Sequence, residues 1–264
     1  MLLKRIIIAV IFIPLLILLI FWGGIGFLLF VCLIISFALF EFYREMEKGS
    51  GHPFLIDGII CGVLVPLFLY IWGEQTLFPL LTLIVFYIFF RQFFKLKVKD
   101  AFANISLTVG GIFYISFLFS YILLLRSLSL IGAKLVITVF FVTWMSDSGA
   151  YLIGRAYGRH KFLVLISPRK SIEGFGGAIL VAVVAIFISR IWLALPLVHT
   201  LVLGICMGIM AQMGDFFESM LKREVGIKDF GRILPGHGGV LDRFDSLLFT
   251  IPLFYYYVRL IIFS

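Results

Sequence analysis

The chain has 264 residues, of which 62% are hydrophobic and only 14% are charged, and its mean hydropathy is +1.17. A soluble domain carries about 25% charged residues, and no soluble fold of this length can bury so much apolar surface. The composition therefore excludes a soluble protein. It predicts an all-α polytopic membrane protein, because a helix satisfies its own backbone hydrogen bonds in lipid.

Apolar runs of about 20 residues, the length of helix that crosses a bilayer, occur about nine times along the chain. The first run follows two basic residues, as in a signal peptide, but it is too long for one and "FWGGIG" is a poor cleavage site. We therefore expect a retained anchor. The fifth run contains Gly110 and Gly111, which favour a kink or a break. The predicted spans cover residues 5–22, 25–41, 54–73, 77–94, 103–125, 134–153, 174–194, 197–217 and 246–263.

The basic residues, which give a net charge of +8, are divided unevenly between alternate loops. If the N-terminus is cytoplasmic, only Arg126, Lys134, Arg190 and Arg259 fall on the outer side, and the other 18 of the 22 Lys and Arg fall inside. This positive-inside pattern predicts an N-in, C-out orientation. It also argues against a nucleic-acid partner, since the basicity is accounted for as an orientation signal.

Polar residues become clustered beyond residue 140. This clustering assigns the chemistry to the second part of the chain. We predict N-terminal transmembrane helices over residues 1–100 and a catalytic transmembrane region over residues 101–264. The catalytic region would carry two cytoplasmic loops, 155–173 and 218–245.

The first polar cluster is "TWMSDSGAYLIGRAYGRH", in which Asp147 lies in or near the end of the sixth span. A carboxylate there costs about 2.5–3.5 kcal/mol on insertion scales, so it needs a wet cavity or a partner. A functional cavity and a purely structural pair with Arg155, two helical turns on, are equally compatible with the sequence. Gly149, Gly154 and Gly158 would permit close approach of a helix or a ligand.

The second cluster is "SPRKSIEG", from Ser167 to Gly174. Ser167 followed by Pro168 is typical of a helix start, with serine as the cap and proline at the first helical position. The N-terminus of a helix offers free N–H groups to an anion, and Arg169 and Lys170 add positive charge. We predict a phosphate site here; the alternative is a basic loop before a capped helix.

The third cluster begins with a polar stripe on the eighth span. Asp215, Glu218, Ser219 and Lys222 fall within one helical arc of about 100°. Gly226 is expected to end this helix. The stripe therefore leads from the membrane into the following cytoplasmic loop.

That loop contains "LPGHGG", whose proline and three glycines favour an open backbone that a ligand can approach. Asp242 and Asp245 follow at i and i+3, on one face of the ninth span. Together with Asp215 they would place three carboxylates at the mouth of two spans, where hard oxygen ligands suit Mg²⁺. The surrounding basic residues need anions, so the segment indicates polyphosphate chemistry; the alternative is a charged loop balanced by salt bridges.

The segment "SMLKREVGIKDFGRILPGHGGVLDRFD", residues 219–245, closely resembles the signature of phosphatidate cytidylyltransferases. Two upstream elements of that family are also similar, "DSGAY" from Asp147 and "SPRKSIEG" from Ser167. The first 100 residues match only as a series of spans, with Glu41 in "FALFEFYR" as a further similarity.

The resemblance implies a nucleotidyltransferase that makes CDP-diacylglycerol and pyrophosphate from CTP and phosphatidic acid. It implies Mg²⁺ as cofactor, with room for a second cation, held by Asp215, Asp242 and Asp245. It assigns catalysis to these three together with Lys222, Arg223 and Lys228. Substrate binding falls to Asp147, Ser167, Arg169, Lys170, Ser219, Asp229, His237 and Arg243. For His237, contact with a phosphate and shaping of the loop stay equally open.

The implied setting is the cell (inner) membrane, with a multi-pass chain, the active site on the cytoplasmic side and a homodimer left open. Three other functions fit the sequence less well. A secondary transporter should show paired repeats with broken helices, and none is apparent. A CDP-alcohol phosphotransferase needs a D-G-x₂-A-R motif followed by G-x₃-D-x₃-D, which is absent. A CTP-dependent polyprenol kinase is the nearest enzymatic alternative, because it also joins CTP to a membrane lipid.

The uneven distribution of basic residues gives a test of orientation. We expect the loops at 155–172 and 218–244 to be cytoplasmic, where CTP is available. Cysteines placed in either loop of the full chain should be protected from a membrane-impermeant thiol reagent in intact cells. Labelling of either loop from outside would contradict both the orientation and the activity.

Overall fold

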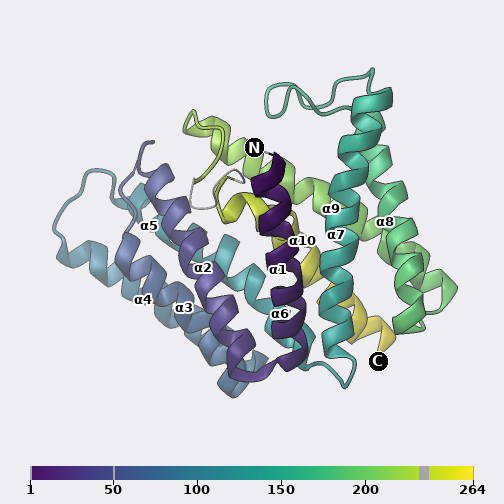
Figure 1. The fold of residues 1–264 in the computed structure, drawn as a ribbon. Coiled ribbons are helices and arrows are strands. Elements are labelled where there is room, and N and C mark those ends of the chain that lie inside the picture. The colour runs from purple at the N-terminus through teal and green to yellow at the C-terminus, as the bar shows by residue number, and fades with distance from the viewer. Residues whose placement is uncertain (1, 50, 232–237, 264) are drawn as a thin grey trace. The chain divides into compact units, whose positions relative to one another are not determined.

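The computed structural model describes residues 2–49, 51–231 and 238–263, and the chain in these ranges is helical apart from its connecting segments (Figure 1). Within the described ranges, the β structure is one isolated antiparallel bridge between Lys161 and Ser171. The predicted all-α fold is therefore confirmed.

The helical segments follow the apolar runs closely. Eight of them, counted over the described residues, are long and apolar enough to cross a membrane, and a shorter apolar stretch, Phe12–Trp22, precedes them. Each predicted span thus coincides with one helix or with consecutive helical segments. The segments are α1 (Leu2–Trp22), α2 (Gly24–Met46), α3 (Leu55–Trp72), η1 (Glu74–Thr76), α4 (Leu77–Phe94), α5 (Ala101–Gly111), η2 (Ile112–Phe117), α6 (Leu118–Ser127), α7 (Gly132–Tyr157), α8 (Ile172–Leu193), α9 (Leu197–Glu224), α10 (Leu241–Tyr257) and η3 (Val258–Ile262).

The fifth span is interrupted where the two glycines predicted it. A π-helical segment, η2, begins directly after Gly111 and joins α5 to α6 within one apolar span, Ala101–Ser127. A π-helical turn is wider than an α-helical one and usually occurs as a single turn within an α-helix. Gly111, just before this turn, lies against Tyr43 of α2, because a Cβ added at Gly111 would lie 2.6 Å from the tyrosine ring.

The chain forms two compact units. The first contains Met1–Leu124 and Glu224–Arg243, and the second contains Leu125–Arg223 and Phe244–Ser264. These units reflect packing, whereas the predicted division at residue 100 concerns function and stays a prediction.

In the first unit, α2 packs against α3, and Tyr43 of α2 is one of the largest completely buried side chains. Its hydroxyl donates a hydrogen bond of 2.7 Å to the carbonyl oxygen of Thr108 in α5. A buried hydroxyl without a hydrogen-bond partner would destabilise the fold by about 1–3 kcal/mol, and this bond removes that penalty. Tyr43 therefore joins α2 to α5.

In the second unit, α7 and α8 lie along one another (Figure 1). Gly149 of α7 faces Val181 of α8, and an added Cβ would lie 2.6 Å from that side chain. Gly154 faces the backbone of Gly174 at 3.3 Å by the same measure. The close helix approach predicted for the glycines after Asp147 is thus confirmed.

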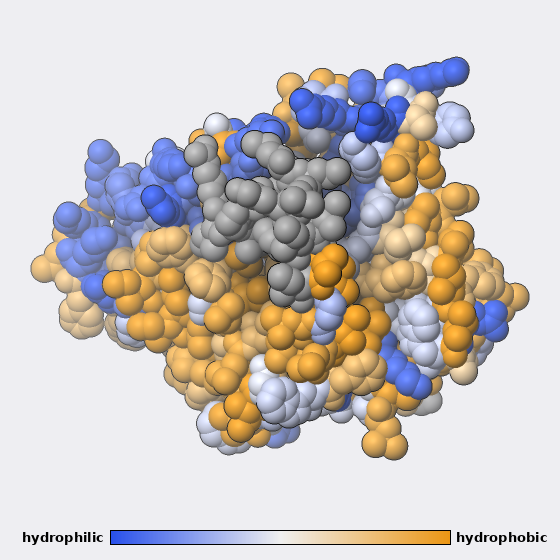
Figure 2. Space-filling view, viewed as in Figure 1, coloured by the Kyte–Doolittle hydropathy of each residue, from blue (hydrophilic) through white to orange (hydrophobic). Residues whose placement is uncertain are grey.

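Large apolar side chains cover the outside of the helices (Figure 2). Phe78 of α4 and Ile191 of α8, for example, are each 84% exposed. Water would penalise so much exposed apolar surface, whereas lipid does not. The chain is an integral membrane protein.

Candidate active site

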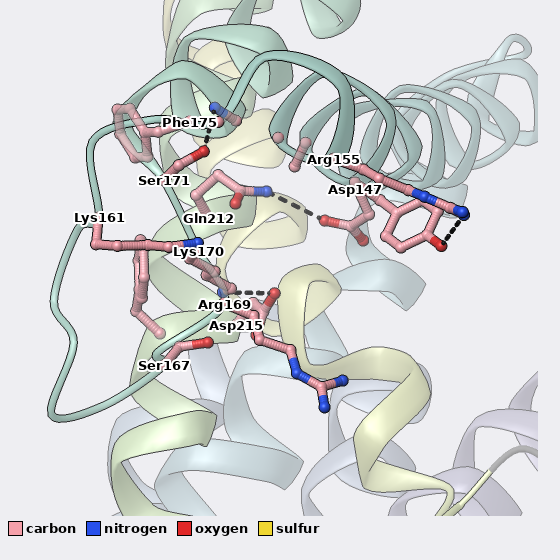
Figure 3. Close-up of a pocket in the computed structure, with 16 residues that line it drawn as sticks. Asp147, Arg155, Lys161, Ser167, Arg169, Lys170, Ser171, Phe175, Gln212 and Asp215 are labelled. Carbon is pink, nitrogen blue, oxygen red and sulfur yellow. Dashed lines mark hydrogen bonds and ion pairs between the residues drawn. The ribbon is translucent and has the colours of Figure 1, made fainter.

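A polar cavity of about 620 Å³ lies in the second unit, between α7, the connection 158–171, α8 and α9 (Figure 3). A polar hollow among apolar helices is where a membrane protein handles charged ligands. The charged and polar side chains that line it include Asp147, Arg155, Lys161, Ser167, Arg169, Lys170, Ser171, Gln212 and Asp215.

The ion pair between Lys170 and Asp215 links the connection 158–171 to α9. The Lys170 ammonium lies 2.6 Å from a carboxylate oxygen of Asp215, and it also lies 4.0 Å from the centre of the Phe216 ring (Figure 3). Both contacts are largely shielded from solvent, which strengthens them relative to surface pairs. Lys170 is therefore held on Asp215, whereas Arg169 is exposed.

Asp147 lies in α7 and is held by neutral partners. It accepts hydrogen bonds from Gln212 of α9, at 3.4 Å, and from the hydroxyl of Ser246 in α10, at 3.2 Å. Arg155 instead donates to the hydroxyl of Tyr151 at 3.1 Å (Figure 3). The structural pair between Asp147 and Arg155 is therefore not formed, and Asp147 faces the cavity.

Asp245 of α10 belongs to the same cluster because α9 and α10 approach closely. A Cβ added at Gly214 would lie 2.7 Å from the carbonyl oxygen of Asp245. The Asp245 carboxylate accepts a 2.7 Å hydrogen bond from the backbone N–H of Ser246 and interacts electrostatically with Asp215. Asp147 in turn interacts with both Asp215 and Asp245. Three carboxylates thus gather in the second unit.

A buried ion pair adjoins this cluster. Glu218 and Lys222 of α9, 1% and 8% exposed respectively, pair with each other at i, i+4. Glu218 also interacts with Asp245. The sequence placed Glu218 on the polar stripe, but only its burial distinguishes it from an ordinary solvated charge. Gln212 and Ser246 were not identified as site residues from the sequence. The signal that could have indicated them is a polar side chain within an otherwise apolar span.

Asp242 lies in the first unit, although it is only three residues from Asp245 on α10. Its carboxylate accepts hydrogen bonds from the backbone N–H groups of Phe230, at 3.1 Å, and Gly239, at 2.7 Å. These two bonds connect Phe230 and Gly239, which lie on either side of residues 232–237 in the sequence, to the same carboxylate. Asp242 therefore has a structural task besides the predicted one.

The donor chemistry suits Mg²⁺, since carboxylate oxygens are its usual protein ligands. Across the described parts of the chain, however, no three Asp, Glu, His or Cys side chains are grouped tightly enough to hold a metal ion as they stand. The cation stays a prediction.

The other predicted site residues are distributed between both units. In the second unit, Ser219 donates to Asp215 at 3.3 Å, and Arg223 donates to the carbonyl oxygen of Ile166 at 3.2 Å. In the first unit, a second cavity of about 650 Å³ is lined by α2 and residues 227–231, including Lys228 and Asp229. Arg243 is exposed. His237 lies outside the described residues.

The predicted helix start at Ser167 and Pro168 is wrong. The helix α8 begins at Ile172, and its cap is Ser171, whose hydroxyl accepts a 3.1 Å hydrogen bond from the N–H of Gly174. Residues 167–170 form a turn instead, closed by the Lys170 N–H on the carbonyl oxygen of Ser167 at 3.2 Å. Ser171 is also in the bridge with Lys161, which leaves Arg169 and Lys170 before the helix rather than in its first turn.

Comparison with known proteins gives a consistent result. The model of the cytidylyltransferase family matches residues 3–261. A phosphatidate cytidylyltransferase of Bacillus subtilis is 32% identical over 243 residues, covering 90% of both chains. Relatives of the same name from Staphylococcus epidermidis and Staphylococcus aureus are 34% and 31% identical, each covering 95% of both chains.

The corrected cap gives a test of local structure. Ser171→Ala should lower the melting temperature in detergent by about 2–4 °C, because loss of a serine cap costs about 1 kcal/mol. Ser167→Ala, four residues earlier, is the matched control and should leave the melting temperature unchanged. Equal losses in both variants would contradict the assignment of Ser171 as the cap.

Proposed function

The chain belongs to the cytidylyltransferase family, and we infer that it has phosphatidate cytidylyltransferase activity. It transfers CMP from CTP to phosphatidic acid, which gives CDP-diacylglycerol and pyrophosphate. The observation that carries this inference is identity above 30% to relatives of that name over nearly the whole chain.

The reaction joins two anions, and this determines what the protein has to supply. An oxygen of the phosphatidate phosphate attacks the α-phosphorus of CTP, a new P–O bond forms, and the bond to the β-phosphate breaks to release pyrophosphate. The attacking oxygen is already anionic at neutral pH, so no strong general base is needed. The barrier lies in bringing the two phosphates together in line, which positive charge and fixed geometry overcome.

We propose that the polar cavity of the second unit binds phosphate groups. Arg169 and Lys170 supply cations at its edge, Lys222 lies on the neighbouring stripe of α9, and Arg223 follows it in the sequence. The ion pair of Lys170 with Asp215 supports this proposal, because it holds the ammonium at the cavity without a substrate. In the first unit, Lys228 is proposed for the same task, as is Arg243.

We propose Asp215, Asp242 and Asp245 as the residues that would hold Mg²⁺, with Asp147 as a further neighbour of Asp215 and Asp245. The ion would neutralise phosphate charge. The gathering of Asp147, Asp215 and Asp245 supports the proposal, since like charges repel one another unless a cation lies near them.

The site is proposed to face the cytoplasm of a cell membrane. CTP is available there, and the positive-inside pattern supports a cytoplasmic position for both polar loops. Phosphatidic acid reaches the protein from the bilayer.

Isotope placement tests the reaction against the polyprenol kinase alternative. Purified protein is given phosphatidic acid, Mg²⁺ and CTP labelled in the cytidine. We expect label in the lipid fraction together with release of pyrophosphate. Release of labelled CDP, with no label in the lipid, would contradict the inferred activity.

The proposed metal ligands are tested by substitution. Asp215→Asn, Asp242→Asn and Asp245→Asn keep the side-chain shape but remove charge that the cation needs. Each should lower the rate of CDP-diacylglycerol formation by about 10²–10³-fold, the usual cost of losing an electrostatic stabiliser of the transition state. The measurement is the rate over a Mg²⁺ titration, with monodispersity checked in detergent.

The control for these variants is Glu224→Gln, at the exposed C-terminal end of α9, which should behave as the unmodified protein. Near-normal rates with unchanged Mg²⁺ dependence in all three Asn variants would remove support for the metal assignment.

A further inference from the structure

Glu41 is a buried carboxylate in the first unit that the proposed reaction does not use. It lies near the C-terminal end of the apolar helix α2 and is only 2% exposed. Burial of a carboxylate is costly unless hydrogen bonds compensate it. Glu41 must therefore contribute something that an apolar residue could not.

Glu41 is hydrogen-bonded to the backbone at the start of α10. One carboxylate oxygen accepts a 3.0 Å hydrogen bond from the N–H of Leu241, 200 residues away in the sequence and the first residue of that helix. The N-terminus of a helix favours a negative charge, so this contact is electrostatically favourable. Glu41 thus anchors the beginning of α10 to α2.

Two glycines fit around the same carboxylate. A Cβ added at Gly231 would overlap one oxygen of Glu41, and a Cβ added at Gly239 would lie 2.6 Å from the other. Any side chain at either position would push the glutamate out of place. The segment and the glutamate are therefore shaped to each other, before and after the undescribed residues 232–237.

A second set of contacts fixes the same segment. Asp242 accepts hydrogen bonds from Phe230 and Gly239, and the Phe230 ring, 1% exposed, lies 5.9 Å from that of Phe42 in α2. Residues 230 and 231 and residues 238–242 are thus held against one stretch of α2. Glu41 and Phe42 are adjacent in that stretch.

We propose that Glu41 is a positioning residue for residues 228–231 and 238–242, which include Lys228 and Asp242 of the proposed reaction. It acts through the backbone of Leu241; its side chain is only 2% exposed and borders the same cavity as Lys228 and Asp229. The inference rests on the proposed function for its consequence on rate. A displacement of about 1 Å at reacting groups costs about 10²-fold, so loss of this anchor is felt in catalysis.

The test compares three variants of the full chain in detergent. Glu41→Leu keeps the size of the side chain but removes both acceptors, whereas Glu41→Gln keeps one oxygen that can accept from Leu241. Glu47→Gln is the matched control, at the C-terminal cap of α2, where the exposed glutamate pairs with His52 outside that cavity. Limited trypsin cleavage after Lys228 reports on the segment, and cleavage after Arg159 and Lys161 reports on the second unit. The rate and the KM for CTP are measured in parallel.

We expect Glu41→Leu to raise cleavage after Lys228 by about 10- to 100-fold, since a buried N–H loses its partner and local opening becomes easier. Cleavage after Arg159 and Lys161 should not change. We expect the kcat of Glu41→Leu to fall by about 10²-fold. The cleavage rate after Lys228 and the kcat of Glu41→Gln should lie between those of Glu41→Leu and those of the unmodified chain. Glu47→Gln should match the unmodified chain in every measurement.

Three results would overturn the proposal. Unchanged cleavage after Lys228 in Glu41→Leu would show that Glu41 does not hold the segment, and equal acceleration at both loops would show a general role in folding. The cleavage experiment does not depend on cytidylyltransferase activity, so failure of the proposed function would leave it interpretable. A normal kcat in a variant with increased cleavage after Lys228 would also contradict the proposal, because the position of this segment would then have no effect on catalysis.

Discussion

Carboxylates inside apolar helices need partners, and this requirement determines how both units are built. Placing such a charge in a membrane span costs about 2.5–3.5 kcal/mol before compensation. In the second unit, Asp215 has Lys170 and Glu218 has Lys222. In the first unit, Glu41 has the N–H of Leu241. Two of these three contacts join different segments, so compensating the charge also fixes how those segments pack.

The two units compensate their carboxylates by different means, and the difference suits different tasks. A lysine ammonium is mobile on its stem and can interact with an incoming phosphate while staying near its carboxylate. A backbone N–H has no such freedom, because its position is fixed by the main chain. A hydrogen bond to it therefore fixes the position of that main-chain segment. The side-chain pairs around the cavity are therefore suited to ligand chemistry, and the backbone contacts of Glu41 and Asp242 are suited to holding the chain before and at the start of α10 in place.

The family's reaction makes this division useful. Transfer between two phosphates requires little proton transfer but strict alignment, so much of the catalytic work is positioning and charge neutralisation. A cavity with cations at its edge answers the second need. Backbone hydrogen bonds to Glu41 and Asp242 answer the first, because they fix the positions of Phe230, Gly239 and Leu241.

The sequence alone determined the membrane class, the positions of the apolar helices, the interruption after Gly111 and the family signature, since composition, run length and motif spacing are local properties. It did not locate the cap of α8, because Ser167 and Ser171 are both acceptable caps and the bridge from Lys161 to Ser171 favours the second. It also could not show that Asp147 turns to Gln212 and Ser246 rather than Arg155, or that Glu41 meets Leu241. These choices belong to the tertiary structure, because the partner of a buried charge depends on which helices pack together and not on the residues beside it.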